Sequence, residues 1–194
     1  MFKSIQVSGT SGSGKTTLVR HYLESSGAVP LRFNEKNKPT VYAGLWEGKP
    51  LFFLGHYLTT SGGCDTIPSV KIVASLLQAL DNDYGNGICL FEGLMISHMV
   101  GTVGAMQVEL GVENHVRAFL DTPLDICLAR VQGRRDARGN TKPFNPDNTI
   151  KDHPRVIAAR DNCEKVDIKT FTINYENAVN SLAEIMLQVD DNGQ

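Results

Sequence analysis

The chain has 194 residues, of which 41% are hydrophobic and 21% are charged, and its formal net charge at pH 7 is −2. This length and composition are typical of one globular domain with a substantial core, which excludes disordered and fibrous proteins. The charge also excludes a surface coated in basic residues, although it leaves room for local basic patches.

The sequence carries no marker of a membrane or secreted protein. No apolar run approaches the ~20 residues that a membrane helix needs. A strand that begins within two residues of the N-terminus leaves no room for a signal peptide. The cysteines form no C-x-x-C pair, which favours reduced, structural thiols without a zinc site. They are Cys64, Cys89, Cys127 and Cys163. We therefore expect a cytoplasmic protein.

The chain opens with a predicted strand, a glycine-rich loop and a helix. Residues 2–8 (FKSIQVS) alternate apolar and polar side chains, as a strand does. The loop GTSGSGKTT follows over 9–17, and helical spacing begins at about Lys15 and continues to Ser25. The apolar face of this helix consists of Leu18, Val19, Tyr22 and Leu23.

Two apolar runs after the first helix predict a β-hairpin. VYAGLW (41–46) and LFFLGHY (51–57) are separated by Glu-Gly-Lys-Pro. Six of the chain's 14 aromatic residues lie in this region: Phe33, Tyr42, Trp46, Phe52, Phe53 and Tyr57. Four cations accompany them: Arg32, Lys36, Lys38 and Lys49. The hairpin is either a stacking surface for bases or a side sheet whose aromatics fill the core.

The rest of the chain alternates helices with strands. We expect helices over 68–79, 124–134 and 154–163, and strands over 87–93, 116–120 and 169–173. Asn174 is a suitable cap for a final helix. The buried stripe of that helix is predicted to be Val179, Leu182, Ile185 and Met186. This alternation indicates an α/β fold with a mainly parallel sheet, and we expect one domain over 1–194.

The loop over 9–17 matches the Walker A pattern G-x-x-x-x-G-K-T, with a strand before it and a helix after it. Glycines allow backbone N–H groups to turn inward around phosphates, and the helix N-terminus adds a positive dipole end. The predicted nucleotide ligands are Gly9, Thr10, Ser11, Gly12, Ser13, Gly14, Lys15, Thr16 and Thr17. Lys15 suits the β- and γ-phosphates, and the Thr16 hydroxyl suits Mg²⁺.

The identity of the nucleotide follows by elimination. A GTPase needs N-K-x-D at a strand end, and the sequence has none. A D-x-x-G occurs over 136–139, but it follows an arginine-rich helix instead of a strand, so we interpret it as chance. ATP is therefore the expected nucleotide.

Glu92 and a group of arginines complete the predicted catalytic residues. Glu92 ends an apolar strand, where it could hold Mg²⁺ or polarise an acceptor, or could be a strand-end carboxylate without a role. Arg130, Arg134 and Arg138 recur every four residues and would share one helix face. This spacing suits a lid, over about 130–150, whose Arg130 and Arg134 bind and neutralise the transferring phosphoryl group. A solvated cationic helix end is the alternative.

These segments resemble the small P-loop kinases that phosphorylate nucleotides, nucleosides or nucleic acids. FLDTPLDICLARVQGRR is similar to the strand, helix and lid entrance of that superfamily. GHYLTTSGGCDTI (55–67) and LFEGLMIS (90–97) resemble phage-encoded members, which include kinases of 5-hydroxymethyluracil in DNA. The resemblance implies a three-layer fold with an acceptor-side insertion over about 30–66, and the host cytoplasm as the place of action.

The resemblance also makes Asp65 the leading candidate for general base, because small kinases place a carboxylate there. Asp65 follows Gly62-Gly63, where the backbone can approach a ligand closely. Alternatively, Asp65 caps the helix expected from Pro68. Glu92 is the other candidate base, and His56 and His98 are weaker ones.

The sequence leaves three functions open. The first is a DNA kinase acting on a hydroxymethylated pyrimidine, which the aromatic and cationic hairpin favours. The second is a soluble (d)NMP kinase, which tolerates the acidic net charge. The third is a nucleotide-driven switch without phosphotransfer, which the lid arginines argue against. Neither the oligomeric state nor the number of phosphates added can be read from the sequence.

Overall fold

The computed structural model describes residues 1–59, 62–99, 114–165 and 168–191. One seven-stranded sheet with the order β2-β3-β4-β5-β1-β6-β7 forms its centre. The strands are β1 (Phe2–Ser8), β2 (Val29–Phe33), β3 (Pro39–Trp46), β4 (Lys49–Leu54), β5 (Gly87–Glu92), β6 (His115–Leu120) and β7 (Thr170–Ile173). From β4 to β7 the strands are parallel, and β2, β3 and β4 pair antiparallel. The predicted α/β class is confirmed.

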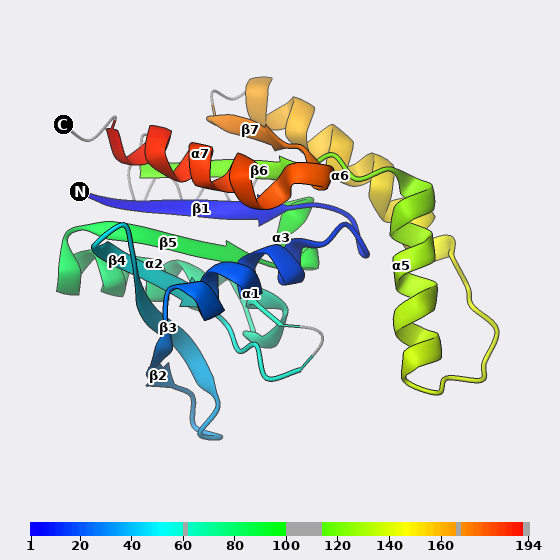
Figure 1. The fold of residues 1–194 in the computed structure, drawn as a ribbon, viewed down its shortest axis with the longest axis horizontal. Coiled ribbons are helices and arrows are strands. Elements are labelled where there is room, and N and C mark those ends of the chain that lie inside the picture. Colours follow the sequence, from blue (N-terminus) through cyan, green and yellow to red (C-terminus); the bar gives the residue numbers. More distant parts are fainter. Residues whose placement is uncertain (60–61, 100–113, 166–167, 192–194) are drawn as a thin grey trace.

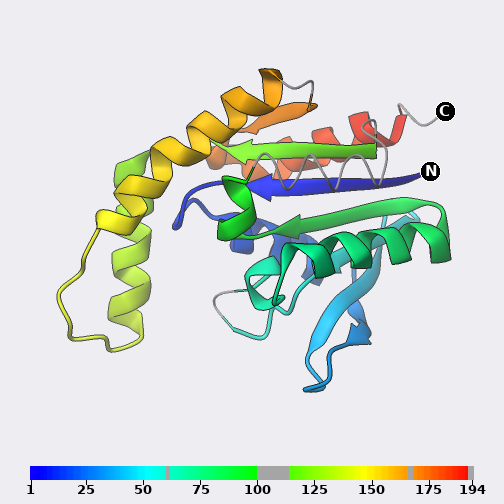
Figure 2. The same cartoon turned by 180° about the vertical axis from the view of Figure 1, so that it is seen from behind.

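Helices cover both faces of the sheet. They are α1 (Lys15–Ser25), α2 (Val70–Tyr84), α3 (Leu94–Ser97), α5 (Leu124–Ala137), α6 (Asp147–Lys165) and α7 (Ala178–Asp191). Figure 1 shows α1 and α7 on one face, and Figure 2 shows α2, α3 and α6 on the other. Two 3₁₀ turns, η1 (Cys64–Thr66) and η3 (Tyr175–Asn177), precede α2 and α7. Every helix in these ranges is too short or too polar to span a bilayer.

The alternation of side chains along the strands builds two cores. Ile5 and Val7 point to the face where Leu18 of α1 and Leu182 of α7 pack. Phe91 points to the opposite face, where α2 packs. All parallel strands end at the same edge of the sheet, and α5 projects beyond that edge (Figure 1). The loops at this edge therefore face a common space, as in other open α/β sheets.

The hairpin belongs to the main sheet, since β4 pairs with β5. The hairpin is therefore part of the central sheet instead of a side sheet, although most of its aromatics fill the core as that interpretation expected, and β2 was not anticipated. Most of the hairpin's aromatics fill the core: Tyr42, Phe52, Phe53 and Tyr57 are at most 7% exposed. Trp46 packs partly buried against the core, and Phe33 is 53% exposed. The expected stacking surface is thus reduced to Phe33.

Three predicted helices begin or pack differently from the expectation. The Ser69 hydroxyl caps α2, which starts at Val70 instead of Pro68. Asp65 therefore does not cap this helix. The helix predicted from Pro154 begins at Asp147, with Pro154 inside it. In α7, Leu182, Ile185 and Met186 are buried as predicted, but Val179 is 37% exposed. Asn174 caps η3, the turn that leads into α7, by accepting the N–H of Glu176.

Candidate active site

The loop over 9–17 joins β1 to α1 at the carboxyl edge of the sheet, where its glycines are required by geometry. Gly12 and Gly14 have φ of +86° and +105°, which other residues rarely adopt. A Cβ on Gly12 would lie 2.2 Å from the carbonyl oxygen of Cys127, so the loop packs directly on α5. Gly14 ends the loop at the N-terminus of α1, where unpaired N–H groups favour anions.

Lys15 is held at the centre of the loop. Its Nζ donates to the carbonyl oxygens of Gly9 at 2.8 Å and Thr10 at 3.0 Å. Burial lowers the pKa of the Lys15 ammonium, whereas Glu92 and Asp65 act in the opposite direction. The negative charges of the Glu92 and Asp65 carboxylates therefore interact with the Lys15 ammonium. An ammonium with carbonyl partners alone can exchange them for phosphate oxygens.

Three of the predicted nucleotide ligands support the loop from behind. Gly9 donates its N–H to Ser97 Oγ at 3.3 Å, and the Thr10 hydroxyl shares a hydrogen bond of 3.1 Å with His153 Nδ1. The Ser13 carbonyl accepts from Thr122 and Arg130. The others line one cavity: Ser11, Gly12, Gly14, Lys15, Thr16 and Thr17.

Glu92 ends β5 beside the first turn of α1. It is 1% exposed, and its Oε1 accepts the Thr16 hydroxyl at 2.9 Å. Burial raises the pKa of the Glu92 carboxyl to about 7, although Lys15 and the Thr16 hydrogen bond act in the opposite direction. Gly63 packs against this carboxylate, since a Cβ there would lie 2.5 Å from Oε1.

Asp65 lies in η1 and faces the same cavity, with an exposed side chain. Its carboxylate accepts the backbone N–H of Leu94 at 2.9 Å and of Met95 at 3.3 Å. Asp65 therefore caps α3 instead of α2. These bonds fix the carboxylate and leave it lone pairs for a further donor.

A buried arginine anchors the other end of α3. Arg117 on β6 is 0% exposed, and its Nη2 donates to the carbonyls of Ser97 at 2.7 Å and Ile96 at 3.2 Å. It also donates to Ser8 Oγ and Cys163 Sγ. Because Ser97 accepts the N–H of Gly9, the phosphate loop, α3 and Asp65 form one hydrogen-bonded unit.

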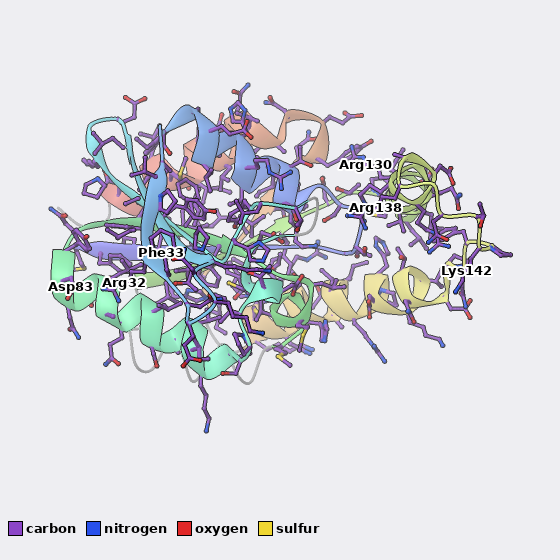
Figure 3. The ribbon with its side chains drawn as sticks, turned by 90° about the horizontal axis from the view of Figure 1, so that it is seen from below. Arg32, Phe33, Asp83, Arg130, Arg138 and Lys142 are labelled. Atoms are coloured by element: carbon purple, nitrogen blue, oxygen red, sulfur yellow. The ribbon has the colours of Figure 1, made fainter. Side chains whose placement is uncertain are left out.

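The arginines of α5 form the cationic wall of the cavity. Arg130 Nη1 donates to the Ser13 carbonyl at 3.1 Å, and the Arg130 guanidinium lies 5.9 Å from the centre of the Tyr175 ring. Arg134 Nη2 lies 3.4 Å from Ser11 Oγ. Arg130, Arg134 and Arg138 line the same cavity, as does Arg135. Figure 3 shows Arg130 and Arg138 at the α5 end of the molecule.

Arg135 fastens the segment between α5 and α6. Its Nη2 donates to the carbonyls of Lys142 at 2.9 Å and Pro143 at 3.3 Å, and its guanidinium lies 5.8 Å from the centre of the Phe144 ring. These contacts place Phe144 and the start of α6 on the cavity.

The phosphate loop, the arginines and the carboxylates described above line one cavity of about 650 Å³. This volume suits a nucleotide-sized ligand. One end is cationic, with the α5 arginines. The other contains Gly62, Asp65, Glu92 and Leu94. Two substrates could therefore meet between Lys15 and the two carboxylates. His56 and His98 do not line it.

The chain is similar in sequence to kinases encoded by phages. A 5-hmdU DNA kinase of Pseudomonas phage PaMx11 is 37% identical over 166 residues, which cover 84% of each chain. The chain belongs to this kinase family. A 5-hmdU DNA kinase of Pseudomonas phage M6 is 28% identical over 195 residues, covering 95% of this chain and 97% of the relative. No protein-family model matches the sequence.

A solved structure shares the fold of this 5-hmdU DNA kinase family member. A gluconokinase from Sinorhizobium meliloti 1021 superposes with a TM-score of 0.55 and 15% identity, over 98% of this chain and 94% of the other. The predicted P-loop kinase fold is thereby supported.

Sequence reasoning missed the part of the site that α6 supplies. Asn145, Asn148, Thr149 and Asp152 line the cavity, as do Gly62 and Leu94. The mostly polar composition of residues 145–152 was the available signal, because a helix face turned to a polar cavity has no apolar period. Arg117 carried no signal, since its role depends on contacts distant in the sequence.

Proposed function

We propose that this protein is an ATP-dependent kinase that phosphorylates the 5-hydroxymethyl group of 5-hydroxymethyluracil in DNA. The 37% identity to a 5-hmdU DNA kinase over most of both chains carries this proposal. The cavity supports it, because a phosphate-binding loop, four arginines and the carboxylates of Asp65 and Glu92 line it. Such a set suits transfer of a phosphoryl group to an alcohol.

The donor occupies the cationic end. The loop N–H groups and Lys15 bind the β- and γ-phosphates, and Lys15 exchanges the carbonyls of Gly9 and Thr10 for phosphate oxygens. Arg130 and Arg134 neutralise the charge that develops during transfer, a contribution of ~10³–10⁵ in rate for arginines in this role. Residues over about 130–150 act as the lid that presents these arginines.

The acceptor hydroxyl lies between the loop and the carboxylates. Its oxygen attacks the γ-phosphorus in line, the bond to the β–γ bridging oxygen breaks, and ADP leaves. Asp65 or Glu92 takes the proton of the hydroxyl. Asp65 is favoured because its carboxylate is exposed to the cavity and held by α3.

Mg²⁺ fits the residues present. It prefers oxygen ligands and usually keeps waters and substrate phosphates in its coordination shell. The Thr16 hydroxyl and the Glu92 carboxylate lie 2.9 Å apart at the phosphate loop and would supply the protein side of such a shell. Among the described residues no three acidic, His or Cys side chains form a complete metal cage. When bound, the ion would offset phosphate charge.

The test is acceptor labelling. The protein is incubated with γ-labelled ATP and, separately, DNA containing 5-hydroxymethyluracil, unmodified DNA, and each nucleoside monophosphate. The proposal expects label in the modified DNA alone, and none with the Lys15→Ala variant. Label in a monophosphate alone would identify a (d)NMP kinase. Phosphate release without any labelled acceptor would indicate a switch.

A further inference from the structure

The turn between β2 and β3 is the exposed end of the hairpin. Phe33 ends β2 and is 53% exposed, whereas four other aromatics of the hairpin region are buried. Asn34 shapes the turn, because its Oδ1 accepts the N–H groups of Lys36 and Lys38, both at 3.0 Å. An exposed aromatic ring thus adjoins a backbone turn that is fixed in shape.

The charges of the hairpin fall into two classes. Arg32 forms an ion pair with Asp83 on α2, and Lys49 forms one with Asp190 on α7. Lys36 and Lys38 pair with no carboxylate in the ranges that the structure describes. The turn also contains one acid, Glu35, which leaves it a net charge of +1 from two lysines and one glutamate.

A short path of contacts links this turn to the acceptor end of the cavity. Gly55 donates its N–H to the Thr40 carbonyl at 2.8 Å, next to the turn. His56 pairs with Gly63, and Gly63 packs on Glu92. Burial, and to a smaller extent the charge of Lys38, lowers the pKa of His56, so Lys38 acts on the residue that pairs with Gly63.

We propose that residues 33–38, named here the strand-binding turn, hold the DNA strand next to the acceptor nucleotide. Phe33 stacks on a base, and Lys36 and Lys38 bind phosphates. The inference rests on the proposed function. Stacking on an aromatic ring beside backbone-tracking cations is how proteins bind single strands without reading sequence. Figure 3 shows Phe33 far from Arg130, Arg138 and Lys142, so strand binding and donor binding use separate surfaces.

The predicted signature is a dependence on acceptor length. None of residues 33–38 lines the cavity, so a free nucleotide bound there should not depend on the strand-binding turn, whereas a strand that extends from the cavity to the turn should. Variants of the turn should therefore raise KM for DNA, leave kcat at saturating DNA unchanged, and leave KM for ATP unchanged.

The test measures phosphorylation and binding with an oligonucleotide of about 16 nucleotides that carries one central 5-hydroxymethyluracil. Two variants probe the turn: Phe33→Ala, and Lys36→Ala combined with Lys38→Ala. Each should weaken DNA binding about 10-fold. The DNA association constant falls as the salt concentration rises, and only the double lysine variant should make this log–log dependence less steep, by about 1.5 in slope. Phe33→Tyr should restore binding, which separates stacking from a folding defect.

Matched controls use the paired cations. Arg32→Ala and Lys49→Ala remove the same charge from the same hairpin, yet should change KM for DNA less than about 2-fold, since each is already neutralised. Glu35→Gln should instead lower KM for DNA, because it removes the negative charge of the turn.

Binding is followed by fluorescence anisotropy without ATP, so it tests the turn independently of catalysis. Unchanged affinity and salt slope in the double lysine variant would overturn the inference, even if the wild type phosphorylates DNA. If the wild type binds DNA through the turn but labels no modified DNA, the proposed function is wrong, whereas the inference that the turn binds DNA is supported.

Discussion

The Thr16 hydroxyl donates a hydrogen bond of 2.9 Å to Glu92 Oε1, joining the first turn of α1 to the end of β5. The two residues are 76 positions apart, and parallel pairing of β1 with β5 brings them together. Glu92 is buried at this point, where Lys15, the Thr16 hydroxyl, Asp65 and Arg20 all act on the pKa of its carboxyl.

Glu92→Gln should impair magnesium-dependent turnover. The amide keeps the shape and can still accept the Thr16 bond, but it removes the negative charge that would help to hold the ion. We expect kcat to fall about 10²-fold and the Mg²⁺ concentration at half-maximal rate to rise. Initial rates measured across a magnesium series check this. The exposed Glu24→Gln on α1 is the control, and an unchanged magnesium dependence in Glu92→Gln would remove Glu92 from the metal site.

Asp65→Asn should separate chemistry from nucleotide binding. The Asn oxygen can still accept the Leu94 N–H, so α3 keeps part of its cap, but the amide cannot take a proton. We expect kcat to fall at least ~10²-fold while the ATP dissociation constant changes less than ~3-fold. Single-turnover rates and calorimetric ATP titration measure the two effects, with Asp81→Asn on α2 as control. Near-normal kcat would transfer the role of base to Glu92.

Arg117→Met should destabilise the protein. The variant keeps the apolar stem but removes the buried donor to the Ser97 carbonyl, and it leaves the Ile96 carbonyl and the Ser8 hydroxyl with Gln6 Nε2 as their donor. Such a loss lowers the free energy of unfolding by about 2–4 kcal/mol. Urea unfolding measures it. Arg160→Met, where the described part of the chain offers the arginine its neighbour Asp161 as ion-pair partner, should cost less than about 1 kcal/mol. Equal free energies of unfolding for the two variants would show that the hydrogen bonds of Arg117 do not stabilise the protein.

His115 predicts a pH dependence of stability. Burial, and to a smaller extent Arg117, lowers the pKa of His115 to about 3. In the unfolded chain its pKa is about 6.5, so between these values the unfolded state binds a proton that the native state does not. The stabilising contribution is complete above pH ~6.5 and is lost as pH falls toward 3, by up to ~1.4 kcal/mol per unit.

The matched measurement compares urea unfolding of the wild type and His115→Asn at about pH 7 and pH 4.5. Asn can retain the contact of 2.7 Å that His115 Nδ1 makes with Ser4 Oγ. The wild type should lose about 2–3 kcal/mol more than the variant between the two pH values. Identical losses would show that the carboxylates alone set the acid sensitivity.

The sequence was sufficient where structure depends on neighbours along the chain. The phosphate loop is local, because Gly12 and Gly14 supply the dihedrals and Lys15 begins the helix. Strand β5 was predictable, since its apolar run is buried on both faces. In contrast, VPLRF of β2 has no clean alternation and is mostly exposed, and it becomes a strand through pairing with β3.

The start of helix α6 was predicted wrongly because Pro154 can lie either in the first turn of a helix or inside one. Pro154 suggested a first helical turn, yet the helix begins seven residues earlier. The first turns lack an apolar face because they line the polar cavity instead of the core. Asp65 was named as a candidate base from its place between the first two helices and it does line the cavity, but its contact with α3 joins residues 29 and 30 apart and leaves no local pattern.

Gly63 places a limit on how this enzyme could diversify. It sits at φ +67° with the Glu92 carboxylate where a side chain would go, so even alanine would displace that carboxylate. Laboratory evolution toward a different alcohol should therefore leave position 63 alone and vary its surroundings, such as Leu94 and the exposed Leu58. In a library that randomises position 63 together with its neighbours, most variants would lack Gly63 and should be inactive.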